Sequence, residues 1–527
     1  MFYSPEQNVI VYDTPDALAI ARACPDARRL HNGYVAAPAH LPNLQALTKA
    51  GMPTIAPLDL HYDWPGLFKP FHAQRLTANF LALNPRAFVL SDMGTGKTLA
   101  ALWAADYIMA QHPPGSCRAL IVSPLSTLRR VWSDEIFQHF MGRRRCVVLH
   151  GTAQQREKQL AHDADFYIIN HDGVGVGATT TRYKSMALRG FAAALEKRSD
   201  IKMVIIDEAS AYRDPGTGRH KVARHLIAGK DYLWLMTGTP TPNGPLDAYG
   251  MAKLVNNAYG ESLTSYKQRV MQQITQFKWV PRPGAMDEAK KLLSPSVRFS
   301  IEDCVDLPPC VTMRMEAELS SEQKQHYKKM KDDLALTLKS GAQITAANEG
   351  VLRSKLVQIS CGAIYDAHHE THLIDAKPRM DVLREALSEC NEKAIIFAPL
   401  TSVLHLLYKE LSKDHACAIV NGAVSQKDRS EIFRAFTQDA NPRILIADPQ
   451  TMAHGLTLTA ATTVVWYGPT DKTELYLQAN KRIHRPGQSK TTRVIQIAST
   501  AVEREIYKRL ENNESLQGVV LKLAEER

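Results

Sequence analysis

The sequence predicts an α/β protein with two lobes, each a parallel sheet covered by helices, and a small α+β module in front of them. Three observations lead to this prediction. Short apolar runs alternate with helical segments from Phe71 to about Ser300, and a second alternating set begins near Lys393. A segment richer in helix lies between the two sets. The first residues follow neither pattern and mix short strands with short helices.

The N-terminal module covers residues 1–62, and prolines punctuate the chain where it ends. Its patterns predict strands over 9–12 and 34–37, and helices over 16–23 and 43–50. The first lobe covers residues 63–300. Its continuous apolar runs are typical of strands buried on both faces, and they predict strands over 87–90, 119–122, 146–149, 166–169, 203–206 and 232–236.

Residues 301–375 are predicted to form a helical insertion and linker, with helices over 321–338 and 349–359. The second lobe covers residues 376–527. Its apolar runs predict strands over 394–397, 418–420, 443–447, 463–466 and 492–496. This lobe has no glycine-rich phosphate loop of its own, which implies that it supplies something across a cleft to the first lobe.

Composition limits the class of protein. At 527 residues the chain is too long for one hydrophobic core, and 45% hydrophobic with 22% charged residues is ordinary for a globular protein. No apolar run approaches the length of a membrane-spanning helix, and the first residues have neither a basic start nor an apolar core. We therefore expect an intracellular, cytoplasmic protein without a membrane partner.

The cysteines and the net charge suggest the compartment and the partner. Eight cysteines are scattered singly, and Cys304 and Cys310 lack zinc spacing, so we expect reduced structural thiols. A formal net charge of +10 favours a polyanionic partner. Runs such as Arg143–Arg145 are, taken alone, more often solvated faces than binding patches.

The string SDMGTGKT lies between an apolar run and a helical segment, as a phosphate-binding turn does. Gly94 and Gly96 let the backbone approach phosphate oxygens, and the N–H groups of the loop and the helix start point at negative charge. Lys97 supplies a cation for the β and γ phosphates, and Thr98 a hydroxyl for Mg²⁺. Ser91 stands where the usual pattern has its first glycine, so a chance glycine-rich turn is the alternative.

An acidic pair follows the apolar run 203–206. In the same sheet as a phosphate loop, Asp207 can hold Mg²⁺ and Glu208 can polarise the attacking water. The alternative is a helix start decorated with acids, but phosphoryl transfer needs both the loop and the acids.

The string QANKRIHRPGQ in the second lobe follows a helix-like stretch over 473–477. Arg482 and Arg485 are three residues apart, so we expect both to lie on one helical face and to enter one cleft together. An arginine against a γ-phosphate stabilises the transition state, with an effect of about 10³ to 10⁵ in rate in other enzymes. A surface basic helix is the alternative.

Several ordered motifs together resemble the SWI/SNF-type branch of the superfamily-two helicase-like ATPases. The resemblance covers about residues 66–510, and three features select the branch: the PLSTL string, the HRPGQ ending and the helical insertion. Ala73, Ser210 and Lys481 depart from the family pattern. The matching strings are SDMGTGKT, ALIVSPLSTLRRVW, DFYIINHD, DEAS, LMTGTPTPN, KAIIFAPLTSVLHLL, MAHGLTLTAATTVVWYGP and QANKRIHRPGQ.

The resemblance implies two RecA-like lobes and an ATP-dependent motor that translocates along duplex DNA. The residues implied for ATP are Gln74 for adenine, with Gly94, Thr95, Gly96, Lys97 and Thr98 for the phosphates. Those implied for Mg²⁺ are Thr98 and Asp207, and those for catalysis are Lys97, Glu208, Gln478, Arg482 and Arg485. The residues expected to face the DNA backbone, in salt-sensitive and largely sequence-independent binding, are Ser123, Thr127, Asn170, His171 and Gly455.

Three other functions stay open. One is a strand-separating or annealing DNA helicase that acts on forks or recombination intermediates, because the N-terminal module resembles the recognition modules of annealing-type relatives. The second is a non-hydrolysing nucleic-acid-binding adaptor, and the third an RNA helicase. We expect a monomeric motor of DNA repair, replication or recombination in a bacterial or phage-infected cell.

Overall fold

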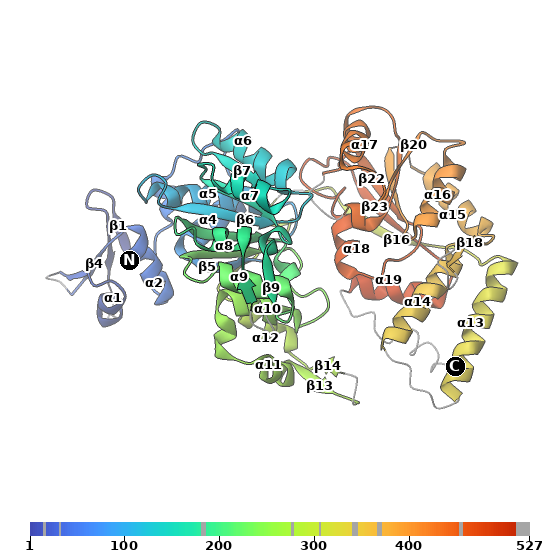
Figure 1. The fold of residues 1–527 in the computed structure, drawn as a ribbon, viewed down its shortest axis with the longest axis horizontal. Helices are drawn as coiled ribbons and strands as arrows, with labels where there is room; N and C mark the ends of the chain where they lie inside the picture. Colours follow the sequence, from blue (N-terminus) through green and yellow to red (C-terminus); the bar gives the residue numbers. More distant parts are fainter. Residues whose placement is uncertain are drawn as a thin grey trace. The chain divides into compact units, whose positions relative to one another are not determined.

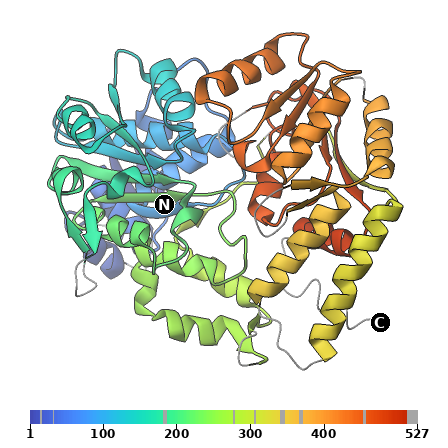
Figure 2. The ribbon, with the colours of Figure 1, turned by 45° about the vertical axis from the view of Figure 1, so that its right-hand side comes forward.

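The computed structural model describes residues 1–13, 17–30, 33–180, 186–275, 279–304, 307–339, 346–365, 371–390, 392–452 and 457–512. The chain divides into two compact units, Met1–Cys304 and Val305–Arg527. Each contains a parallel sheet with its covering helices, which can be followed in Figure 1 and, from a second direction, in Figure 2. The predicted α/β class with two parallel sheets is confirmed.

The N-terminal module is an antiparallel sheet with two helices. The strands lie in the order β1-β2-β4-β3, and the apolar side chains of Ile10, Val35 and Leu44 form its core. The predicted strands and helices are confirmed; β1 and β3 are additional, too short and too exposed to show a pattern. The elements are β1 (Phe2–Ser4), β2 (Val9–Tyr12), α1 (Ala17–Ala23), β3 (Arg28–Arg29), β4 (Val35–Pro38) and α2 (Leu41–Lys49).

The first unit contains a seven-stranded sheet in the order β15-β5-β12-β11-β6-β8-β7, in which every pair is parallel. All six predicted strands are present; β15 was missed because it has only two residues. The strands are β5 (Arg86–Val89), β6 (Arg118–Ser123), β7 (Cys146–Leu149), β8 (Phe166–Asn170), β11 (Ile201–Asp207), β12 (Tyr232–Met236) and β15 (Ser296–Val297).

Helices and two small hairpins surround this sheet. Because the strands are buried on both faces, their side chains form two apolar cores, one on each side. The helices are α3 (Pro57–His61), α4 (His72–Leu83), α5 (Lys97–Ala110), α6 (Asp134–Phe140), α7 (Ala153–Leu160), α8 (Gly190–Glu196), α9 (Gly218–Leu226), α10 (Asp247–Val255), α11 (Leu263–Val270) and α12 (Ala285–Leu292). The hairpins are β9 (Ala178–Thr180) with β10 (Met186–Leu188), and β13 (Met271–Gln273) with β14 (Trp279–Pro281).

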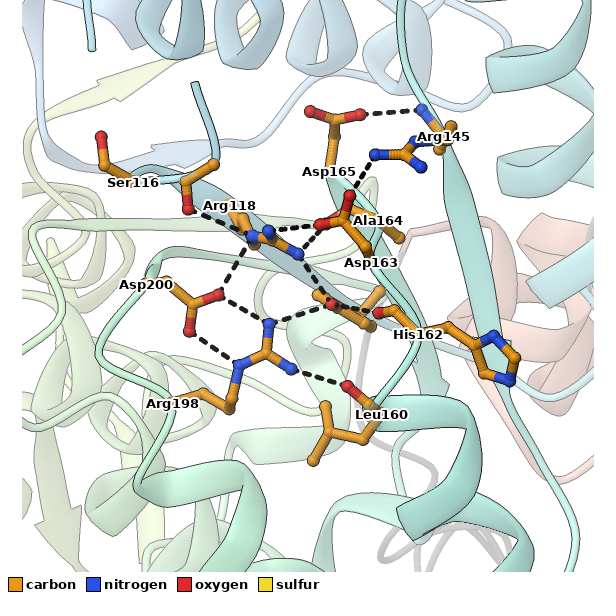
Figure 3. Close-up of polar contacts among 12 residues, drawn as sticks. Ser116, Arg118, Arg145, Leu160, His162, Asp163, Ala164, Asp165, Arg198 and Asp200 are labelled. Carbon is orange, nitrogen blue, oxygen red and sulfur yellow. Dashed lines mark hydrogen bonds and ion pairs between the residues drawn. The ribbon is translucent and has the colours of Figure 1, made fainter. Parts of the chain in front are cut away.

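An ion-pair network joins the residues where β6, β8 and β11 begin (Figure 3). Arg198 donates to both carboxylate oxygens of Asp200, at 2.7 and 2.6 Å, and Arg118 Nε lies 3.0 Å from Asp200 Oδ2. Both guanidinium groups also donate to the hydroxyl of Tyr167. The hydrogen bonds from Arg198 lower the pKa of Asp200. We refer to Arg118, Arg198, Asp200 and Tyr167 as the amino-edge network.

The three arginines of the basic run Arg143–Arg145 form ion pairs with nearby aspartates. Arg143 Nε and Arg144 Nε both contact the carboxylate of Asp106, which is fully buried, and Arg145 pairs with Asp163. These arginines therefore stabilise the first unit rather than forming an uncompensated patch.

The second unit contains a six-stranded parallel sheet in the order β16-β23-β22-β19-β21-β20. The five predicted strands are confirmed, as are the two predicted helices, which are α13 (Ser321–Lys339) and α14 (Ala346–Ser360). The sheet consists of β16 (Cys310–Glu316), β19 (Lys393–Phe397), β20 (Cys417–Val420), β21 (Ile444–Ala447), β22 (Ala461–Trp466) and β23 (Thr492–Ala498).

The helices of the second unit are α13 (Ser321–Lys339), α14 (Ala346–Ser360), α15 (Lys377–Ser388), α16 (Thr401–Leu411), α17 (Gln426–Gln438), α18 (Thr473–Asn480) and α19 (Ala501–Glu511), and its hairpin is β17 (Ala363–Tyr365) with β18 (Thr371–Leu373). The segment 301–375, predicted as a helical insertion and linker, also contributes a strand to the second parallel sheet. It supplies β16 to the edge of the sheet, and Leu356 and Ile359 to the core. Most side chains of β16 are exposed, so the sequence shows no buried run there.

The buried side chain of Arg379 bonds to several elements in the core of the second unit. Its side chain is fully buried and donates to Glu503 Oε1 at 2.7 Å, to the carbonyls of Tyr467 and Ile497 at 2.7 Å each, and to the carbonyl of Ser360 at 3.1 Å. One guanidinium group therefore connects α14, α15, α19 and the ends of two strands.

Two sequence expectations concern the chain as a whole. The eight cysteines are free thiols, as expected. Among the residues that the structure describes, no helix has the length and apolar character that crossing a bilayer requires. The same residues contain no group of three or more histidine, cysteine or acidic side chains arranged to hold a metal ion.

Candidate active site

The predicted phosphate loop connects the end of β5 to the start of α5. Gly94 and Gly96 have φ of 85° and 74°, which residues with a Cβ rarely adopt. Lys97 Nζ donates to the carbonyls of Ser91 and Asp92 at 2.7 Å each. The lysine side chain therefore folds back onto the backbone of the loop. The N–H groups of the loop lie at the start of a 14-residue helix.

Ser91 connects this loop to the segment directly after β15. Its hydroxyl accepts the N–H of Phe299 at 3.0 Å, and its side chain is 1% exposed. Backbone hydrogen bonds on either side, Leu90 N to Val297 O and Asp92 N to Phe299 O, continue the ladder. The serine that departs from the usual glycine thus has a defined structural partner.

Gln74 lies against the phosphate loop. It is buried in α4, and a Cβ added to Gly96 would come within 2.2 Å of its Nε2. Its Oε1 accepts the N–H of Phe71 at 3.2 Å, which fixes the amide orientation. The structure therefore places Gln74 beside the loop, and its role toward adenine stays a prediction.

Asp207 is the last residue of β11, two strands from β5 in the same sheet, and Glu208 follows it. Trp132 Nε1 donates to Asp207 Oδ2 at 3.1 Å, and the Glu208 N–H donates to Oδ1 at 3.0 Å. Burial raises the pKa of Asp207, while the charge of Lys97 opposes the rise. Glu208 adopts a left-handed conformation with φ 49° and ψ 51°, a strained state for a residue with a side chain.

Lys97, which begins α5 after β5, and Asp207, which ends β11, therefore lie at the same edge of one parallel sheet. No role for Trp132 was predicted from the sequence, although this residue ends the motif ALIVSPLSTLRRVW. A buried indole N–H needs an acceptor, which is the signal that could have pointed to it. Gly238 of LMTGTPTPN also approaches the loop, because a Cβ there would lie 3.4 Å from Met93 N.

The described residues expected to face DNA lie at the ends of β6 and β8 or directly after them. Ser123 and Asn170 are opposite each other in the ladder. The side chains of Ser123 and Thr127 are buried, whereas Ser126 and Arg129 of the same loop are exposed. Asn170 Oδ1 accepts from Arg156 at 3.2 Å. Contact of these residues with DNA stays a prediction, and Gly455 lies outside the described residues.

The second unit positions Gln478, Arg482 and Arg485 at the end of α18. Gln478 is buried and donates to Glu474 Oε1 at 3.1 Å. Arg482 is 3% exposed, and burial lowers the pKa of Arg485.

The expectation that Arg482 and Arg485 share a helical face is wrong. α18 ends at Asn480, and residues 481–487 form a turn. Pro486 disfavours helical continuation before it, and Gly487 has φ 96°. Gln488 Nε2 closes the turn with bonds to three carbonyls, those of Thr459, Ala461 and Ile483.

A phosphate loop and an acidic strand end at the same edge of a parallel sheet define the first unit as a phosphate-binding-loop domain, and a second parallel-sheet unit follows it. A model of the SNF2-related domain matches residues 80–361, more than half of the chain, and a model of the helicase conserved C-terminal domain matches residues 378–487. The chain belongs to the SNF2-related family, which confirms the resemblance to the SWI/SNF-type branch.

In curated relatives about a quarter of the aligned residues are identical to those of this chain. An uncharacterized ATP-dependent helicase of Mycoplasma genitalium is 25% identical over 437 residues, covering 79% of this chain and 38% of the relative. The DNA annealing helicase and endonuclease ZRANB3 of Bos taurus is 24% identical over 443 residues, covering 81% and 38%. The chain thus spans about two fifths of the length of these relatives.

A solved structure that is similar to this chain is the Sulfolobus solfataricus SWI2/SNF2 ATPase core in complex with double-stranded DNA. The identity is 21% and the TM-score 0.39, over 85% of this chain and 92% of that chain.

Proposed function

We propose that the protein is a motor that hydrolyses ATP to translocate along, or remodel, duplex DNA. The observation that carries this proposal is that the loop holding Lys97 and the strand end holding Asp207 lie at the same carboxyl edge of the first sheet. A cation for phosphates and an acid for a metal are the two components that phosphoryl transfer requires. Family membership and relatives named as ATP-dependent or DNA annealing helicases support the same reaction.

In this proposal the triphosphate lies along Gly94–Thr98, with Lys97 leaving the carbonyls of Ser91 and Asp92 for phosphate oxygens. The Thr98 hydroxyl and the Asp207 carboxylate are hard oxygen donors of the kind that Mg²⁺ prefers, so both residues fit a magnesium ion, which would neutralise phosphate charge. Glu208 orients the attacking water. From the second unit, Arg482 and Arg485 are proposed to stabilise charge on the γ-phosphate, with Gln478 beside them.

We propose that DNA is bound through its phosphates. The net charge of +10 supports a polyanionic partner, and phosphate contacts carry little sequence information. Binding should therefore weaken steeply with salt and vary little with sequence. Eight unpaired thiols support an intracellular location, and we propose a monomer as the working state.

The decisive experiment compares duplex DNA, single-stranded DNA and RNA as activators of ATP hydrolysis. We expect duplex DNA to activate most, and Lys97→Ala or Arg485→Ala to abolish stimulated hydrolysis while the circular dichroism spectrum stays that of the wild type. Near-normal turnover in either variant would remove the assigned mechanism. A wild-type chain without turnover would favour the non-hydrolysing adaptor, and activation by RNA alone the RNA helicase.

Fork annealing or separation is a second candidate, favoured by one feature of the N-terminal module. Arg28 and Arg29 form an exposed edge strand, β3, on a sheet that has its own core. Deleting the module would expose buried surface in the rest of the first unit, because Leu41 packs in an apolar core of the first parallel sheet and Gln45 donates to Ala82 O at 2.8 Å. Charge reversal at Arg28 and Arg29 is the cleaner test; it should reduce activity on forks but not on plain duplexes.

A further inference from the structure

We propose that Tyr212 is a positioning residue that links the loop after β8 to the turn carrying Glu208, so that a nucleic acid bound at the β8 loop changes the rate of hydrolysis. The proposal rests on the proposed function, because it needs DNA-stimulated hydrolysis. Tyr212 belongs to no residue set assigned from the sequence, and it lies in the short 3₁₀ helix Ala209–Tyr212 directly after Glu208.

The link consists of two contacts between His171 and Tyr212, and an ion pair to α9 lies beside it. His171, which follows β8, has its Nδ1 3.2 Å from the hydroxyl of Tyr212, and the two rings meet edge-on with centroids 5.5 Å apart. The next residue, Asp172, pairs with Arg219 at the start of α9, at 2.6 Å. Tyr212 is 1% exposed, so its contact is shielded from water, whereas the Asp172 pair is at the surface.

The tyrosine hydroxyl is suited to this contact because it keeps its proton. Burial is the main cause that raises the pKa of Tyr212, and the charge of Asp172 adds to the rise while that of Arg219 opposes it. The hydroxyl can therefore donate to a neutral imidazole nitrogen, or accept from it in the other tautomer.

The turn that carries Glu208 is fixed on its other side by α10. A Cβ on Gly250 would lie 2.2 Å from the carbonyl oxygen of Arg213 and 2.4 Å from that of Tyr212, so backbone meets backbone there. Within the turn, Ala211 N donates to Glu208 O at 3.1 Å. Because α10 blocks movement of the turn on that side, we infer that a shift of the Tyr212 side chain changes the backbone conformation at Glu208, which is already strained.

Tyr212→Phe tests the link, because it removes one oxygen and keeps the ring in the core. Losing a hydrogen bond of about 1 kcal/mol corresponds to about a fivefold change in rate. We expect the maximal DNA-stimulated kcat to fall about fivefold, with the unstimulated rate, the KM for ATP and the DNA concentration for half-activation all within twofold of wild type.

Tyr266→Phe is the matched control, because Tyr266 is also buried in the first unit and its hydroxyl donates to Pro245 O at 2.9 Å, away from the link. It should leave stimulation unchanged. In a double-mutant cycle, His171→Ala and Tyr212→Phe should lower kcat no more together than His171→Ala does alone.

Two results would overturn the link: full stimulation in Tyr212→Phe, or an equal fall of the stimulated and unstimulated rates, which a purely structural role would give. Failure of the proposed function is distinguishable, because wild-type protein would then show no DNA-stimulated hydrolysis at all.

Discussion

Replacing Ser91 with alanine removes the side-chain hydrogen bond between the phosphate loop and the segment directly after β15. In the wild type the Ser91 hydroxyl accepts a hydrogen bond from the Phe299 N–H at 3.0 Å. Ser91 itself is 1% exposed. The flanking bonds, Leu90 N to Val297 O at 2.8 Å and Asp92 N to Phe299 O at 2.9 Å, involve only backbone and remain. The substitution therefore isolates one contact of the loop.

The expected magnitude follows from leaving a half-buried amide without its acceptor, which costs about 1–3 kcal/mol. If 1–2 kcal/mol of that cost appears as disorder of the loop before nucleotide binds, the Kd for ATP rises about 5- to 30-fold. Ser91→Gly, which restores the usual glycine pattern, should weaken binding further because glycine adds backbone freedom.

Titration with a fluorescent ATP analogue, together with urea unfolding, measures both effects. Ser360→Ala is the matched control, since Ser360 is a fully buried serine of the second unit whose hydroxyl donates to Val357 O at 3.0 Å. The control should lose stability and keep its nucleotide affinity. If Ser91→Ala binds the analogue within twofold of wild type, the reasoning that Ser91 orders the loop is refuted.

Three further outcomes follow from buried groups. Arg379→Met should lower the free energy of unfolding by about 3–5 kcal/mol in urea titrations by leaving the Glu503 carboxylate buried without its partner, and a loss below about 1 kcal/mol would contradict this. Burial lowers the pKa of His220 in the folded protein. The stability contributed by the neutral imidazole is therefore present above the unfolded pKa of about 6.5 and is lost as the pH falls below that value. In urea titrations between pH 7 and 5, His220→Gln should reduce the loss of unfolding free energy by at most about 1.4 kcal/mol per pH unit. The exposed Cys310 should react with a thiol reagent in the native protein before Cys361, whose pKa burial raises to about 12; equal rates at the two thiols would exclude this burial.

Most of the fold could be predicted from the sequence because its strands are buried on both faces. The run Met203–Ile206 is continuous and apolar, and it lies inside β11. β15 and β16 escaped prediction for the opposite reason: one has two residues and the other exposes most of its side chains. Neither leaves a local pattern, and only pairing with β5 and β23 makes them strands.

The candidate site was predictable where its chemistry is local in the chain and not where it depends on tertiary contacts. The loop around Lys97 and the acids after β11 are contiguous strings, whereas the partner of Ser91 lies 208 residues away. Arg482 and Arg485 show the limit of helical spacing. The pattern assumed that α18 continues, but the side chain of Asn480 is held by Trp466 Nε1 at 2.8 Å and the chain turns before Pro486.

The amino-edge network has a consequence for how the first sheet can move (Figure 3). It clamps β6, β8 and β11 where they start, and the same strands finish at Ser123, Asn170 and Asp207. The first residues of these strands are therefore held by side-chain ion pairs and hydrogen bonds as well as by the backbone ladder, which opposes sliding of one strand along its neighbour. We therefore expect amide hydrogen exchange in β6, β8 and β11 to be slower near the first residues of each strand than near the last.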